Sequence, residues 1–205
     1  RRLVTYYSLL TQMRVNGGND YINLVNSILS GKCNQQACLE NYDFKVMSDF
    51  NRFNNLQQKL EDEFTLSRMI AGYAWEWKSK KDKSLYDMEL DGVKKQWNYR
   101  LENWVLSEGA DKQVGCIHTI QGFDLNYGFV IMGNEIGYDP ESKEIIVRPE
   151  NYYDQNGRKT ASKEELLEYI KHIYYVLMTR GIKGTYLYIC DDNLRKYVSS
   201  IIGEI

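Results

Sequence analysis

The order of apolar and polar residues along this chain predicts an alternation of helices and strands. Two segments carry apolar residues at the three- and four-residue spacing of an amphipathic helix, and a third opens with a capping box, in which Glu165 follows Ser162 by three residues. Together with a closing helix, the expected helices lie at residues 20–29, 50–64, 162–178 and 191–202. Asn19 or Asp20 is expected to cap the first of them.

Short apolar or alternating stretches between these helices predict strands. They lie at residues 3–10, 42–49, 67–75, 114–118, 129–133, 143–149 and 184–190, and a short helix is expected between the fourth and the fifth. A strand followed by a helix and another strand is typical of a parallel sheet with crossover helices. The predicted fold class is therefore α/β, with a mostly parallel sheet and flanking helices.

Residues 76–112 interrupt this alternation. The segment contains the basic run KSKKDK and tryptophans set among charged residues, and we expect a hairpin with loops. Because the chain has 2 prolines and no linker-like or repeated stretch, residues 1–205 are interpreted as one domain that carries this aromatic and basic insertion. The sequence starts on an apolar run without methionine, so it is interpreted as a fragment of a longer chain.

Composition excludes several classes of protein. A formal net charge of −2 over 205 residues, of which 43% are apolar, is typical of a globular protein and gives no overall basic field for nucleic acid. The sequence has no run of about 18 apolar residues and no signal-peptide pattern, which predicts a cytoplasmic protein with no membrane partner. The cysteines at positions 33, 38, 116 and 190 lack the second Cys/His pair of a zinc site, so no metal ligands are predicted.

Polar residues at three joints between predicted helices and strands are the candidates for chemistry. Ligands of open parallel sheets bind near the carboxyl ends of the strands, and the sequence places TQMRVNGG, HTIQGFD and LMTRGIKGT at such joints. Taken singly, each joint has a structural explanation. Arg14 would cap a helix or pair with a nearby carboxylate, and Gln121-Gly122 would form a strand-to-helix turn. Arg180 would stabilise the C-terminus of the preceding helix through the helix dipole.

Taken together, the three stretches resemble the second RecA-like domain of superfamily-1 helicases, a P-loop NTPase fold. In that family an early segment ends in arginine, a middle one reads Thr-x-x-Gln/Ser-x-Gly-hydrophobic-Asp/Glu, and a late helix ends in ALTR before a strand. The corresponding stretches here are LLTQMR, HTIQGFD and YVLMTRGIKGTYLY. More narrowly, GCIHTIQGFDLNYGFVIMG and TRGIKGTYLY, with SRMIAGYAWEWKSK before them, look like the uncharacterised bacterial and phage Schlafen-like DNA/RNA helicase family. The resemblance spans residues 9–197.

The resemblance implies part of an ATP site. Arg180 would be an arginine finger, which places positive charge with bidentate geometry on the γ-phosphate oxygens, and Arg14 would be a second γ-phosphate contact. Gln121 and Gly122 would shape the loop that couples nucleotide to nucleic acid. Asp124 would approach the ribose.

Two expected parts of such a site do not occur in this sequence. It contains no G-x-x-x-x-G-K-[ST] phosphate loop and no convincing strand-end Asp-Glu pair for Mg²⁺. We therefore expect ATP and Mg²⁺ to bind only together with an upstream RecA-like domain of the same polypeptide. On this interpretation the chain is part of an ATP hydrolase and is inactive alone.

Nucleic acid, either DNA or RNA, is the other expected partner. The resemblance implies that Thr119 contacts a nucleic-acid phosphate. In the insertion, Lys78, Lys80, Lys81 and Trp77 combine the lysines and aromatic rings with which proteins hold single strands. The same mixture includes Lys83, Trp75, Tyr86 and Trp97. The alternative is that the tryptophans pack the insertion onto the sheet while the lysines face solvent.

Two other classes of function remain open. Glu76-x-Lys78 at the end of a predicted strand is the carboxylate–lysine arrangement of Mg²⁺-dependent restriction-type nucleases, with Asp43 or Asp49 as a second metal ligand. The other class is a non-catalytic interaction module that has no nucleotide role.

Overall fold

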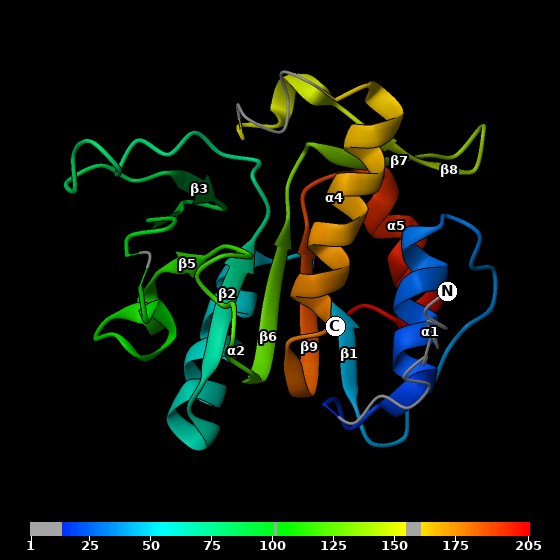
Figure 1. Cartoon of the computed structure of the whole chain (residues 1–205). Coiled ribbons are helices and arrows are strands. Elements are labelled where there is room, and N and C mark those ends of the chain that lie inside the picture. The colour runs from blue at the N-terminus through cyan, green and yellow to red at the C-terminus, as the bar shows by residue number, and fades with distance from the viewer. Residues whose placement is uncertain (1–13, 101, 155–160) are drawn as a thin grey trace, which may run out of the picture.

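The computed structural model describes residues 14–100, 102–154 and 161–205 (Figure 1). The strand expected at residues 3–10 lies outside this part of the chain. The helices are α1 (Gly18–Leu29), α2 (Phe50–Phe64), α4 (Lys163–Met178) and α5 (Asp192–Ile202), with 3-10 turns η1 (Trp104–Leu106), η2 (Ala110–Lys112) and η3 (Pro149–Asn151). The strands are β1 (Asp43–Val46), β2 (Ser67–Ala71), β3 (Met88–Leu90), β4 (Val93–Lys95), β5 (Val114–Gly115), β6 (Leu125–Met132), β7 (Ile136–Asp139), β8 (Glu144–Val147) and β9 (Gly181–Ile189).

Five of the strands form one parallel sheet in the order β1-β9-β6-β2-β5. Side chains of β6 and β9 alternate between two apolar layers. Val130 and Leu187 face the layer built with α1, α4 and α5, whereas Phe129 and Tyr186 face the layer built with α2. Figure 1 shows α4 in front of the sheet and α2 behind it. The α/β prediction with a parallel sheet flanked by helices is confirmed, and the arrangement is consistent with a RecA-like domain.

Local sequence signals explain most of the helix boundaries. The capping box of α4 is present, since Ser162 Oγ accepts a hydrogen bond from the Glu165 amide at 3.2 Å and Glu165 Oε2 accepts one from the Ser162 amide at 2.8 Å. The cap predicted for α1 is wrong. This helix begins at Gly18 after Gly17, and a Cβ on Gly17 would lie 2.6 Å from Tyr21 Cβ. Close packing therefore selects glycine at this position in place of a polar cap.

The structure corrects three expectations about strands and turns. Residues 117–122 form turns instead of the short helix expected there, and β6 begins at Leu125, four residues earlier than predicted. The strand β9 begins at Gly181 instead of Gly184. Gly184 lies inside the strand, where a Cβ would come within 2.8 Å of the Asp43 carbonyl oxygen, so this glycine reflects close backbone approach and not the start of the strand. The strand β7 was not predicted, and it pairs antiparallel with β8.

The segment between β2 and β5 contains the hairpin expected in the insertion. Its strands β3 and β4 pair antiparallel as a separate two-stranded sheet. Figure 1 shows this segment beside the β5 edge of the main sheet. Trp97 and Trp104 are buried, and Arg68 of β2 donates two hydrogen bonds to the Val105 carbonyl, at 3.1 and 2.9 Å. Buried tryptophans and this arginine therefore hold the segment to the sheet.

Candidate functional site

Three of the predicted site residues meet at one edge of the sheet. Asp124 and Arg180 directly precede the neighbouring strands β6 and β9, and the Leu125 amide donates a hydrogen bond to the Arg180 carbonyl at 3.0 Å. Arg14 reaches the same place, with its Nε 2.8 Å from Asp124 Oδ1. The fold thus gathers side chains from two distant joints and from the stretch before α1, which we call the arginine site (Arg14, Asp124 and Arg180).

The arginine site lies at the amino edge of the sheet and not at the carboxyl edge that the sequence favoured. The helix α4 ends at Met178, so only Thr179 and Arg180 remain before β9 begins. After the two-residue strand β5, the chain turns back through residues 117–122 and reaches the start of β6. The expectation that these joints follow the carboxyl ends of strands is therefore wrong for Asp124 and Arg180, because both joints lead into a strand.

The electrostatics of the arginine site favour an anion. Arg180 is half-buried, and burial lowers the pKa of its guanidinium; the nearby Arg14 lowers this pKa further, while Asp124 opposes the shift. Arg180 Nε is buried and has no hydrogen-bond acceptor among the described residues. Two guanidinium groups thus converge near the Asp124 carboxylate, an arrangement that would attract an anionic ligand.

The last carbonyls of α4 already have hydrogen-bond partners other than the Arg180 side chain. The donors to the carbonyls of residues 175–178 are the Thr179 amide and hydroxyl, the Arg180 amide, the Tyr21 hydroxyl and the Thr185 hydroxyl. The guanidinium of Arg180 is therefore not needed to satisfy the end of this helix.

The loop between β5 and β6 holds the remaining predicted coupling residues. Gln121 and Gly122 are exposed, and Gly122 has φ +84° with open space where a Cβ would lie. Thr119 differs from them because it is buried. Its hydroxyl accepts a hydrogen bond from the Cys116 amide at 2.8 Å and donates one to the Cys116 carbonyl at 3.0 Å. Both hydrogen-bonding functions of Thr119 thus serve the turn, and a phosphate would reach it only if the turn opened.

The predicted nucleic-acid residues of the insertion divide into two kinds. Lys78, Lys80 and Lys81 are exposed. Trp77 is half-buried and packs edge-on against Trp97, with ring centroids 6.1 Å apart. Its indole Nε1 is buried without an acceptor among the described residues.

The carboxyl edge of the sheet carries a buried carboxyl group that the sequence analysis missed. Glu135 follows β6, is fully buried and accepts a hydrogen bond from the Tyr174 hydroxyl of α4. Burial raises the pKa of Glu135 to about 7, which Tyr174 partly opposes. Beside it, Arg148 pairs with Asp191 at 2.7 Å. The signal was present in the sequence, because Glu135 stands two residues after the strongest predicted strand.

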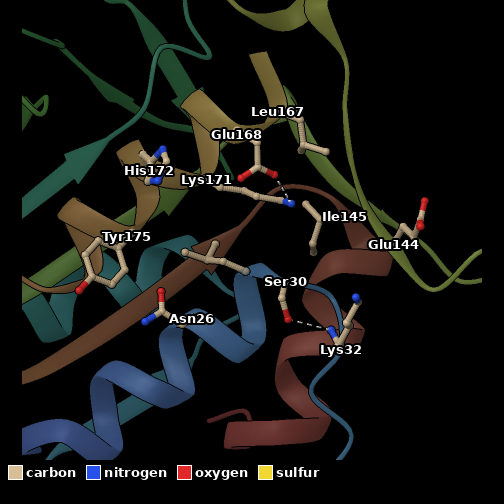
Figure 2. Close-up of a pocket in the computed structure, with 11 residues that line it drawn as sticks. Asn26, Ser30, Lys32, Glu144, Ile145, Leu167, Glu168, Lys171, His172 and Tyr175 are labelled. Carbon is tan, nitrogen blue, oxygen red and sulfur yellow. Dashed lines mark hydrogen bonds and ion pairs between the residues drawn. The ribbon is translucent and has the colours of Figure 1, made fainter. Parts of the chain in front are cut away.

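A cavity of about 690 Å³ lies between α1, α4 and β8 (Figure 2). Its size is within the range of small-molecule sites. The charged residues at its wall have both signs, and Lys171 is paired with Glu168 at 2.8 Å. The lining consists of Asn26, Leu29, Ser30, Lys32, Glu144, Ile145, Leu167, Glu168, Lys171, His172 and Tyr175. None of the predicted site residues is in this set, and the mixed charge does not select one class of ligand.

The geometry does not gather the residues of the nuclease alternative. Glu76 follows β2, whereas Asp43 begins β1, and β9 and β6 lie between these two strands. Asp49 caps α2 by accepting a hydrogen bond from the Arg52 amide at 3.0 Å. Within the described ranges, no group of three or more His, Cys, Asp or Glu side chains is placed to hold a metal ion.

Comparison with known proteins identifies relatives for most of the chain. The family model described as Schlafen group 3, DNA/RNA helicase domain, matches residues 2–191. An uncharacterised protein of Saccharomyces cerevisiae is 31% identical over 215 residues, which cover 93% of this chain and 47% of that relative. The chain thus spans about half the length of that relative. No solved structure matches this chain. Among the described helices, none is both long and apolar enough to cross a membrane.

Proposed function

Because this chain belongs to the Schlafen group 3 DNA/RNA helicase domain family, we propose that it is the second RecA-like motor domain of a nucleic-acid-dependent ATPase. Arg180 and Arg14 would act on ATP whose phosphates and Mg²⁺ are held by an upstream domain of the same polypeptide. This chain would then supply the positive charge for catalysis, and the upstream domain would supply the phosphate loop.

The observation that carries the proposal is the convergence of Arg14 and Arg180 beside Asp124. These arginines are far apart in the sequence, yet each contacts or electrostatically influences the same carboxylate. In phosphoryl transfer, catalysis depends on positioning and on positive charge at the γ-phosphate oxygens. Two guanidinium groups at one edge of the sheet match that requirement.

The environment of Arg180 suits the role of an arginine finger. Its half-buried side chain has limited freedom, and its buried Nε has no acceptor within the described part of the chain. A phosphate oxygen would provide that acceptor. Charge-assisted hydrogen bonds of this kind are about twice as strong as neutral ones.

Asp124 would hold Arg14 in place until nucleotide arrives. The pair is exposed, with 41% and 45% of the side chains accessible, and exposed ion pairs contribute only about 0–1 kcal/mol. Opening of this pair would let Asp124 approach the ribose and Arg14 contact the γ-phosphate. Gln121 and Gly122, which directly precede this region, would transmit the change to bound nucleic acid.

DNA or RNA would bind to the insertion and to the loop between β5 and β6. Lys78, Lys80 and Lys81 are exposed and would contact phosphates. Thr119 would join them after the turn around Cys116 opens. A cytoplasmic location also belongs to this proposal.

The test is the nucleic-acid-stimulated ATPase activity of the full-length protein with Arg180→Ala. Because an arginine finger is worth about 10³- to 10⁵-fold in turnover, we expect kcat to fall by about 10³-fold or more while ATP still binds. Arg195→Ala is the matched control, since Arg195 pairs with Asp192 on α5, and this variant should keep full turnover.

Unchanged turnover in Arg180→Ala would overturn the role of Arg180 in catalysis. If the wild-type protein has no ATPase activity and Arg180→Ala still binds its partners normally, the chain is an interaction module. Binding of a fluorescent ATP analogue separates a loss of catalysis from a loss of nucleotide affinity.

A further inference from the structure

Two exposed tyrosines lie on adjoining segments of the insertion. Tyr86 precedes β3 and Tyr99 follows β4, and their exposed fractions are 53% and 39%. Exposed aromatic side chains are available to stack on a ligand. Two such residues on one hairpin segment therefore form a candidate contact surface.

Hydrogen bonds fix the backbone that carries both rings. Gln96 Nε2 donates to the carbonyls of Lys83 and Leu85, at 2.6 and 3.0 Å. The buried Asp87 accepts hydrogen bonds from the Ser79 amide and hydroxyl and from the Trp97 amide, at 2.8, 2.6 and 2.6 Å. Both tyrosines thus lie on segments whose backbone is already held by hydrogen bonds, which lowers the entropic cost of binding a ligand.

Exposed lysines lie on the same segment as the two rings. Lys83 Nζ donates to the Tyr99 carbonyl at 2.7 Å and lies 4.2 Å from the centre of the Tyr99 ring. Lys78, Lys80 and Lys81 are also exposed, and Asp82 is the only acidic residue between positions 78 and 83. This stretch is therefore basic in a chain whose overall charge is −2.

Trp77 is poorly suited to stack on a ligand. It is half-buried, it packs edge-on against the buried Trp97, and its indole Nε1 is buried. Trp97 and Trp104 are buried and support the fold of the segment, whereas Tyr86 and Tyr99 are exposed. The ring of Trp77 is therefore a weaker candidate for base stacking than an exposed aromatic ring.

We propose that Tyr86 and Tyr99 stack with unpaired bases of a single-stranded nucleic acid whose phosphates contact Lys80, Lys81 and Lys83. Aromatic rings bind single strands because every unpaired base offers a flat π-face, and lysines along the path neutralise the backbone. In a duplex those faces are covered by neighbouring base pairs, so the same surface would select single strands. The inference rests on the proposed function only in taking nucleic acid as the partner.

The test is fluorescence anisotropy of the full-length protein with labelled single-stranded DNA and RNA of about 20 nucleotides, without ATP. Each stacked base is worth on the order of 5- to 150-fold in affinity. We therefore expect the double variant Tyr86→Ala/Tyr99→Ala to bind at least about 10-fold more weakly. Tyr86→Phe/Tyr99→Phe should bind like the wild type, because phenylalanine keeps the ring.

Tyr169→Ala is the matched control, since Tyr169 is a tyrosine of α4 with a similar exposed fraction of 42%. Its affinity should not change. Lys80→Ala/Lys81→Ala should reduce the slope of log affinity against log salt by about 1.4, because each phosphate contact on a single strand contributes about 0.7.

Wild-type affinity in Tyr86→Ala/Tyr99→Ala would overturn the proposal, and so would equal weakening by Tyr169→Ala. Tighter binding of a matched duplex than of single strands would overturn it as well. An unchanged circular dichroism melting curve excludes misfolding of the alanine variant. If that variant melts early, the phenylalanine variant is the test: it keeps both rings, so a weak affinity with an unchanged melting curve would overturn the proposal. Since ATP is not needed, this result is independent of the Arg180 test.

Discussion

Replacing Glu135 by glutamine should change how the stability of the protein depends on pH. Glu135 is fully buried at the carboxyl edge of the sheet, and burial raises its pKa to about 7 from the ordinary value of 4.5. Below pH 4.5 the carboxyl is protonated in both the folded and the unfolded protein. Between pH 4.5 and about 7 the unfolded protein loses this proton while the folded protein keeps it, so stability falls as pH rises.

The size of this effect follows from the two pKa values. At about 1.36 kcal/mol for each pH unit, the difference between 4.5 and about 7 amounts to about 3 kcal/mol above pH 7. About 2.5 kcal/mol of this should be lost between pH 5 and pH 8. The neighbouring titratable groups do not obscure the window, because burial raises the pKa of Tyr174 well above its usual range and that of Cys190 to about 12.

Urea denaturation of the wild type and Glu135→Gln at pH 5 and pH 8 measures this loss. Glutamine keeps the carbonyl that accepts from the Tyr174 hydroxyl, but it does not ionise. The difference in unfolding free energy between the two proteins should therefore shift by about 2.5 kcal/mol in favour of the variant at pH 8. The exposed Glu150→Gln is the control and should show no such shift. A difference that is the same at both pH values would refute the burial argument.

Two further substitutions test how the elements around the site are anchored. Ser162→Ala removes the capping box that Ser162 forms with Glu165. We expect the free energy of unfolding to fall by about 1 kcal/mol and the melting temperature, measured by circular dichroism, to fall by about 2–4 °C. An unchanged melting temperature would contradict this role of the cap. Arg68→Ala leaves the half-buried carboxylate of Glu61 without the guanidinium that lies 2.6 Å away, and it removes both donors to the Val105 carbonyl. Urea denaturation should therefore show that the free energy of unfolding falls by about 3–5 kcal/mol. A fall below about 1 kcal/mol would show that the ion pair is not a structural anchor.

The helices and the parallel sheet could be predicted because their signals are local. Apolar spacing identified α2, and the Ser162–Glu165 box identified the start of α4. The alternation of helices and strands then indicated a parallel sheet, since a crossover connection leaves few other arrangements. The family was indicated by the resemblance of three short stretches to helicase motifs, because helix and strand patterns alone do not identify a family.

The parts that were not predicted depend on contacts between distant residues. The strand β7 contains Gly137, which makes the stretch look like a turn. A Cβ there would lie 2.6 Å from a terminal nitrogen of Arg148 and 2.9 Å from Asp191, so a larger residue would have to displace this ion pair. The pairing of Arg14 with Asp124 joins positions on different elements. The sequence named both residues, but only the three-dimensional register shows that they meet at the amino edge of the sheet.

The position of Arg180 after the end of α4 bears on the two roles considered for it. A cation near a helix C-terminus interacts favourably with the dipole, but this is worth only about 0.3–1 kcal/mol at an exposed site. The carbonyls of residues 175–178 already accept hydrogen bonds from other groups. A purely structural arginine would therefore bring little stability to a place where Arg14 already repels it. Under the proposed function, an anion bound between the two guanidinium groups would offset that repulsion. On this argument Arg180→Ala should lower turnover by about 10³-fold or more with little change in melting temperature, whereas the loss of a helix-end cation would leave turnover unchanged.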